Sequence, residues 1–184
     1  KYPEIDQNGE TSVKGIYIIG DLTGIPLLKL AAESGKKIIT YLSEDHDFNK
    51  LRSENKNDQI NDLLIIGAGP AGIAAGLEAQ KRDINFKILE SSKKFNTIIN
   101  FPKGKPIFAE PDDFEQESDL KINDGTKETL LDELESQIVG EDLHVEEDTY
   151  VSQIEKEKGI FNVNTNNGTY KALRVIIARG KSGN

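Results

Sequence analysis

Four apolar segments recur along the chain, and each is followed closely by a glycine or an acidic residue. They span residues 16–19, 63–66, 84–89 and 173–178. Short runs rich in Ile, Val and Leu are typical of strands buried on both faces of a parallel sheet. We therefore expect four buried strands. Their carboxyl ends carry Gly20-Asp21, Gly67, Glu90 and Gly180, and ligands of open α/β sheets bind beyond such ends.

Two further segments show the apolar spacing of helices. Residues 26–42 contain Pro26 in the expected first turn and Gly35 as a site of close packing. Residues 126–138 repeat the spacing, with Thr126 as the expected N-cap and an apolar stripe that we assign to the core. The stripe comprises Leu130, Leu131, Leu134 and Ile138.

Polar segments separate these elements. Residues 43–61 are almost wholly polar and charged, which predicts a surface linker with at most a helical turn. Residues 91–119 contain Pro102, Pro106 and Pro111 and lack helical periodicity, so we expect a long shaped loop. Such loops often carry function, and the alternative is a partly ordered surface excursion.

Apolar and polar residues alternate over most of residues 143–172. The pattern predicts strands at 143–145, 150–154, 160–165 and 169–172, with a hairpin turn at Asn167-Gly168. These strands should form a small antiparallel ribbon that crosses over the helix layer. The patterns together predict an α/β fold, namely a Rossmann-like domain with a central parallel sheet, helices and this ribbon.

Glycines follow the second apolar run in the spacing G-x-G-x-x-G. Gly67 permits a tight turn, Gly69 lets a pyrophosphate approach the backbone, and Gly72 lets the helix pack close to the strand. The helix N-terminus then offers free N–H groups and a partial positive charge to phosphates. Glu90 ends the next strand, where a carboxylate accepts hydrogen bonds from ribose hydroxyls and repels a 2′-phosphate. The combination predicts a dinucleotide site, against the alternative of a tightly packed βα turn.

The composition argues against several classes of binding partner and site. The chain has 184 residues and a formal net charge of −9, with no basic block that would follow a nucleic acid backbone. No run approaches the ~20 apolar residues of a membrane span, and no leader is visible, so we expect a cytoplasmic protein. The chain contains no cysteine, which excludes a C-x-x-C redox pair within it, and its two histidines lack partners at metal-ligand spacing. It also lacks Met and begins at Lys1, so we expect a piece of a longer protein.

Three stretches, and in addition the end of the last apolar run, resemble the flavin-binding domain of the thioredoxin-reductase-like pyridine nucleotide-disulfide oxidoreductases. The glycine unit of residues 62–80 with Glu90 is similar to the family's FAD fingerprint. Residues 99–104 (INFPKG) resemble its Glu-Asn-Tyr/Phe-Pro-Gly loop. Residues 11–21 (TSVKGIYIIGD), followed by Ala31, Ala32 and Gly35, resemble its second FAD motif, and residues 175–180 resemble its Ala-Thr-Gly strand end.

The resemblance implies FAD as the cofactor and NAD(P)H as the hydride donor of the parent enzyme. It implies pyrophosphate binding by the glycine turn, adenosine ribose binding by Glu90, ribityl binding by Asp21, and contacts to the flavin edge from Asn100 and from amides near Ile25. The full set of expected cofactor-binding residues is Gly20, Asp21, Ile25, Gly67, Gly69, Pro70, Ala71, Gly72, Glu90, Ser91, Thr97, Asn100, Val151, Ala178, Arg179 and Gly180. No catalytic residue and no metal ligand is expected.

The chain departs from the family pattern in its order. The Gly-Asp segment normally follows the glycine fingerprint, whereas here it precedes it. We expect residues 1–42 to complete the sheet, residues 43–61 to link, and residues 62–184 to form the FAD-binding domain, ending before an NAD(P)H domain. An alternative is that residues 1–42 complete the sheet of a neighbouring copy in a swapped homodimer. Arg179 replaces a small or hydroxyl residue of the family, and it either crowds the cofactor or contacts a phosphate.

Three functions remain open on these grounds. The first is the FAD domain of a flavin-dependent NAD(P)H oxidoreductase whose unknown electron acceptor is not a disulfide. The second is a non-catalytic FAD-binding or nucleotide-binding module. The third is an NAD-binding Rossmann domain, against which Asp21 and the Asn-Phe-Pro loop argue. For the chain alone we expect cofactor binding without NAD(P)H turnover.

Overall fold

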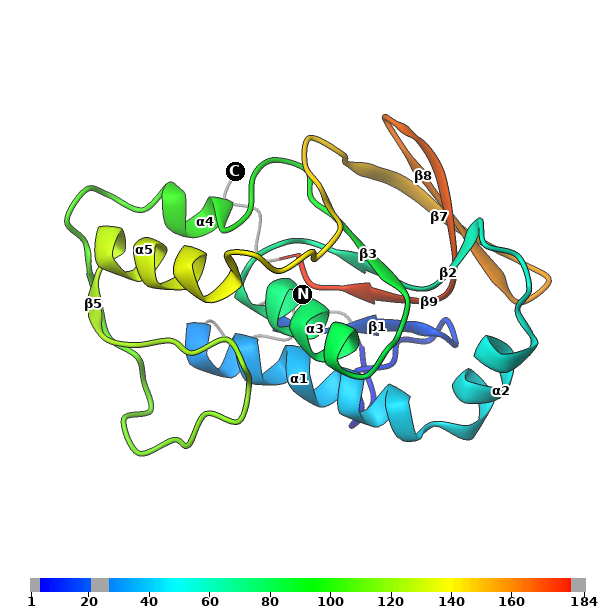
Figure 1. Ribbon diagram of the computed structural model, residues 1–184, viewed down its shortest axis with the longest axis horizontal. Helices are drawn as coiled ribbons and strands as arrows, with labels where there is room; N and C mark the ends of the chain where they lie inside the picture. Colours follow the sequence, from blue (N-terminus) through cyan, green and yellow to red (C-terminus); the bar gives the residue numbers. More distant parts are fainter. Residues whose placement is uncertain (1–3, 21–26, 180–184) are drawn as a thin grey trace.

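A parallel sheet forms the centre of the fold in a computed structural model that describes residues 4–20 and 27–179. Its strands are β1 (Ile16–Ile18), β2 (Ile60–Ile66), β3 (Phe86–Leu89), β6 (Val145–Glu146) and β9 (Gly168–Ile177). They lie in the order β6-β3-β2-β9, and β1 pairs with the carboxyl half of β9. All of these pairings are parallel, which confirms the four predicted buried strands and the α/β class (Figure 1).

Helices α1 (Leu28–Glu44) and α3 (Pro70–Lys81) lie side by side on one face of the sheet (Figure 1). Gly35 of α1 sits against the backbone of α3, and a Cβ at this position would collide with the carbonyl oxygen of Ala71. The prediction of a close-packing glycine in this helix is therefore confirmed. Pro26, expected in its first turn, lies outside the described residues.

Helix α2 (His46–Glu54) occupies the middle of the segment for which the sequence indicated a linker with at most a helical turn. Asp45 caps it by accepting a hydrogen bond from the backbone N–H of Phe48, at 3.0 Å. The Phe48 ring is fully buried, and Arg52 pairs with Asp62 at the start of β2, with 3.1 Å between Nε and Oδ2. The segment is thus docked on the domain through a helix of its own.

The antiparallel ribbon consists of β7 (Val151–Glu157), β8 (Ile160–Thr165) and the first half of β9. Several details differ from the sequence prediction. The segments 169–172 and 173–178 are not separate strands, because β9 runs unbroken from the ribbon into the parallel sheet. The strand expected at 143–145 is not part of the ribbon, because β6 pairs in parallel with β3, and His144, with a φ of 50°, precedes it.

The ribbon closes a second core on the sheet face away from α1 and α3, rather than crossing over the helix layer. Phe161 and Val163 of β8 pack there with Leu64, Ile66 and Val175 of the parallel strands. On the helix face, alternate residues of the same strands, such as Leu63 and Ile65, join the larger core. The central strands are therefore covered on both faces, as their continuous apolar runs require.

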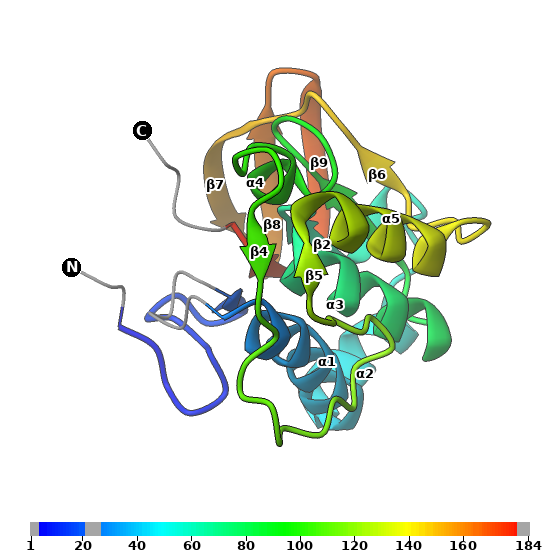
Figure 2. The ribbon, with the colours of Figure 1, turned by 90° about the vertical axis from the view of Figure 1, so that its left-hand side faces the viewer.

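Residues 91–126 form a long excursion that includes the predicted loop of residues 91–119, and it is ordered by short elements. It contains α4 (Asn96–Ile99), β4 (Pro106–Ile107) and β5 (Gly125–Thr126), of which the two strands pair (Figure 2). Helix α5 (Lys127–Ile138) follows, with Thr126 as its N-cap. Leu130, Leu134 and Ile138 are buried, as predicted for the core.

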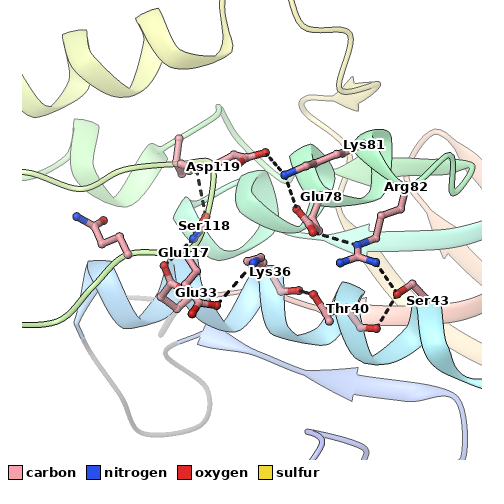
Figure 3. A network of polar contacts seen from close by, with 12 residues as sticks. Glu33, Lys36, Thr40, Ser43, Glu78, Lys81, Arg82, Glu117, Ser118 and Asp119 are labelled. Carbon is pink, nitrogen blue, oxygen red and sulfur yellow. Dashed lines mark hydrogen bonds and ion pairs between the residues drawn. The ribbon is translucent and has the colours of Figure 1, made fainter.

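Polar contacts hold this excursion against α1 and α3 (Figure 3). The buried Glu33 accepts a hydrogen bond from the backbone N–H of Ser118 at 2.8 Å, and Lys36 pairs with Glu117 at 3.7 Å. Lys81 of α3 pairs with Asp119 at 3.4 Å. The contacts of Glu33 and Lys36 join α1 to a segment that lies far from it in the sequence.

We expect Phe48→Ala to lower the free energy of unfolding by about 3–5 kcal/mol, because the ring is fully buried and its loss leaves a cavity. Urea unfolding followed by circular dichroism measures the change. Lys50→Ala, on the exposed face of the same helix, should change stability by less than about 0.5 kcal/mol. Equal effects of the two substitutions would show that α2 is not docked as described.

Candidate functional site

A cavity of about 590 Å³ lies at the carboxyl edge of the parallel sheet. The ends of β1, β2, β3 and β9 border it, together with the first turn of α3, helix α4 and residues 149–151. It brings together most of the predicted cofactor-binding residues, which are Gly20, Gly67, Gly69, Pro70, Ala71, Glu90, Ser91, Thr97, Asn100, Val151, Ala178 and Arg179. Of the others, Gly72 is not among the lining residues, and Asp21, Ile25 and Gly180 lie outside the described residues.

The three glycines of the turn differ in what surrounds them. Gly67 has a φ of +113°, and a Cβ there would lie 2.8 Å from the carbonyl oxygen of Ala178. A Cβ at Gly72 would collide with the carbonyl oxygen of Gly67, which explains why the helix needs glycine there. Gly69 has an ordinary φ of −82°, and a Cβ there would meet no atom of the described residues within 4 Å. Packing within the turn therefore accounts for Gly67 and Gly72 but leaves Gly69 unexplained.

Residues of the segment that follows β3 form hydrogen bonds with both the backbone N–H and the carbonyl oxygen of Ala68. The backbone N–H of Ala68 donates to Oε1 of Glu90 at 2.9 Å, and its carbonyl oxygen accepts from the N–H of Phe95 at 2.9 Å. The second carboxylate oxygen of Glu90 accepts from the N–H of Ser92 at 2.7 Å. Glu90, only 8% exposed, thus braces the glycine turn in addition to lining the cavity.

Phe95 begins α4 in a left-handed conformation, with φ 58° and ψ 30°. Such a conformation is uncommon for a bulky residue and persists where the surrounding contacts determine it. Here the buried ring packs in the main core, while the N–H of the same residue reaches Ala68. Phe95 therefore sets the position of α4 relative to the glycine turn.

The Asn-Phe-Pro loop follows α4 and borders the cavity through Asn100 and Phe101. Its far end is anchored on α5, because the N–H of Gly104 donates to the carboxylate of Glu128 at 2.9 Å. This hydrogen bond lowers the pKa of the Glu128 carboxyl, since it favours the ionised form. The anchor holds Asn100 at the cavity edge from outside the cavity.

Sequence reasoning missed several lining residues. The aromatic residues Phe95, Phe101 and Tyr150 border the cavity, as do Asn96 and Thr149. They lie in loops or short elements, where no periodicity distinguishes them. The sequence placed these residues near the site only through their closeness in the chain to Thr97, Asn100 and Val151, which were predicted to bind the cofactor.

Other kinds of site find no support in the described ranges 4–20 and 27–179. No helix there combines the length and apolarity that a bilayer crossing requires. No group of three or more acidic, histidine or cysteine side chains gathers there in a way that suits a metal ion.

Comparison with curated proteins finds oxidoreductases. An uncharacterized CzcO-like oxidoreductase of Geobacillus kaustophilus is 29% identical over 126 residues, covering 66% of this chain and 36% of that protein. Ferredoxin–NADP reductase of Lactococcus lactis is 33% identical over 122 residues, covering 65% and 35%. Thioredoxin reductase of Mycoplasma pneumoniae is 39% identical over 66 residues, covering 32% and 21%. The matches thus span about a third or less of each relative's length.

Solved structures share the fold. The bacillithiol disulfide reductase Bdr of Staphylococcus aureus superposes with a TM-score of 0.57 at 22% identity, covering 66% of this chain and 39% of that one. OTEMO, in a complex with FAD and NADP, gives a TM-score of 0.54 at 18% identity, covering 65% and 25%.

The family model described as pyridine nucleotide-disulphide oxidoreductase matches residues 64–184, which include the glycine turn, Glu90, the Asn-Phe-Pro loop and β9. This range is well over half of the 184-residue chain. The chain belongs to the pyridine nucleotide-disulphide oxidoreductase family.

Proposed function

We propose that the cavity binds FAD and that the chain is the flavin-binding part of an NAD(P)H-dependent oxidoreductase. The observation that carries the proposal is Gly69. Among residues 4–20 and 27–179, no atom lies within 4 Å of where its Cβ would be, whereas the other glycines of the turn are tightly packed. A residue that needs no special φ and has no close neighbour is best explained by a ligand that approaches its backbone.

The lining residues suit the parts of such a dinucleotide. The first turn of α3, which no side chain caps, offers N–H groups to the pyrophosphate. Each carboxylate oxygen of Glu90 has a second lone pair, so Glu90 can accept from ribose hydroxyls while it still accepts from Ala68 and Ser92. Gly20 at the end of β1 and Asn100 border the part of the cavity proposed for the ribityl chain and flavin edge.

A bound flavin would supply hydride and electron transfer, which no side chain of this chain provides. The protein's share is to hold and orient it. Family membership and the three matching motifs support FAD over a plain NAD site, as does a cavity bordered by both β1 and β3. The chain contains no cysteine, so we infer that its electrons pass to an acceptor other than a disulfide of this chain.

We predict that Gly69→Ala weakens FAD binding at least about tenfold and leaves the free energy of unfolding within about 1 kcal/mol of wild type. The new methyl group would occupy the space needed by the phosphates, and a φ of −82° suits alanine. Titration of FAD fluorescence measures the affinity, and urea unfolding without ligand measures the stability.

Gly72→Ala is the matched control, and it should lower stability by about 1–3 kcal/mol because its Cβ would collide with the Gly67 carbonyl. Wild-type affinity in Gly69→Ala would refute the ligand role of Gly69. A wild-type chain that cannot be reconstituted with FAD would refute the proposed function itself.

We predict that Glu90→Gln destabilises the ligand-free chain by about 1–3 kcal/mol. An amide keeps one acceptor oxygen but turns an NH2 group toward the backbone N–H of either Ala68 or Ser92, which then lacks its partner. Urea unfolding is the measurement. Glu146→Gln, which affects an exposed ion pair with Lys87, should change stability by less than about 1 kcal/mol. An unchanged unfolding midpoint in Glu90→Gln would show that Glu90 does not brace the turn.

A further inference from the structure

Of the cavity-lining residues that the structure describes, two carry a formal charge, namely Glu90 and Arg179. Glu90 directly follows β3, and Arg179 lies two positions after the end of β9. Strand β2 runs between β3 and β9 and leads into the glycine turn. The negative and the positive residue therefore lie on opposite sides of that turn.

Arg179 is directly next to the start of the turn. A Cβ built on Gly67 would lie 3.1 Å from the backbone nitrogen of Arg179. The two charged residues differ in their surroundings, since Glu90 is buried and bonded to two backbone N–H groups, whereas Arg179 is exposed. Among ion pairs formed within residues 4–20 and 27–179, none involves Arg179.

Because the chain is negatively charged overall, a cation at position 179 would favour the binding of an anionic ligand. The chain carries a formal net charge of −9, which opposes the approach of an anionic ligand. The α3 N-terminus contributes only a partial positive charge, and its effect falls off within the first turn. A guanidinium adds a full charge and a planar fork of donors that matches phosphate oxygens in a bidentate manner.

We propose that Arg179 pairs with the diphosphate of the bound dinucleotide and is a determinant of affinity for ligands that carry one. The proposal rests on the proposed function, and it decides between the two roles left open for this residue, contact with a phosphate and crowding of the cofactor. It divides the recognition of the ligand between two charges. Glu90 faces the uncharged ribose diol, and Arg179 faces the anionic centre of the molecule.

Binding of ADP, adenosine and FAD to the wild-type chain and to Arg179→Gln tests this division, with calorimetry for ADP and adenosine and fluorescence for FAD. Arg179→Gln should lower the affinity for ADP and for FAD at least tenfold, and the affinity for adenosine less than twofold. The dependence of ADP affinity on salt concentration should also become shallower, because one ion pair is lost. Arg179 is exposed, so the unfolding midpoint should stay at the wild-type value.

Lys93→Gln is the matched control. Lys93 is also a cation near the end of β3, but it pairs with Asp148 at 2.9 Å and is not among the residues that line the cavity. Its substitution should leave the affinity for all three ligands unchanged.

The outcomes separate the two levels of the proposal. A wild-type chain that binds neither ADP nor FAD overturns the proposed function, and the role of Arg179 falls with it. If the wild-type chain binds ADP and FAD, and Arg179→Gln binds them equally well or more tightly, only the role of Arg179 is overturned. Tighter binding by the variant would show that the Arg179 side chain crowds the ligand. An equal loss for adenosine and ADP would also overturn it, because the effect would then not depend on phosphate.

Discussion

The contact between the backbones of α1 and α3 at Gly35 fixes where the first segment of the chain sits. Glycine is required there, because a Cβ would collide with the carbonyl oxygen of Ala71 and lie 2.8 Å from the nitrogen of Ala75. This approach sets the end of β1 beside the first turn of α3, where a Cβ at Gly20 would be 3.2 Å from that of Ala71. Without it, the glycine turn would border only part of a cavity.

The order of segments along the chain is unimportant for this geometry. Strand β1 comes first in the sequence but pairs with β9, the last of the described strands. Because the strands are parallel, their carboxyl ends lie at the same edge of the sheet whichever segment comes first in the sequence. Helix α2, held by its Asp45 cap and by the pair of Arg52 with Asp62, spans the distance from α1 to β2. A segment order unlike that of the family therefore remains compatible with one cavity.

Local patterns could predict the strands, the glycine turn and Glu90, since each depends on nearby residues. Helix α2 could not be predicted in full, because its only apolar residues are Phe48 and Leu51 and its stability comes from tertiary contacts. The continuity of β9 was hidden because its first half pairs with β8 and its second half with β1, so different neighbours set its pattern. The left-handed Phe95 has no sequence signature at all, since its conformation follows from contacts with Ala68 and the core.

Glu90 shows that a residue proposed to bind a ligand can have a second role that the sequence does not reveal. The position at the end of β3 predicts a ribose ligand, but the structure adds a second task, because both carboxylate oxygens already hold backbone N–H groups. One wall of the cavity is consequently a connected unit, in which Glu90 and Phe95 fix the turn through Ala68. The opposite wall, formed by Gly20, Leu28 and Ala31, belongs to a segment held in place by different contacts, those of α1 with α3 and with the excursion. A ligand that touches both walls binds the folded arrangement and not the unfolded chain, so its binding energy adds to the stability of the contact at Gly35. A ligand bound in the cavity would therefore stabilise the contact between α1 and α3 at Gly35, which is the contact that brings the two walls together.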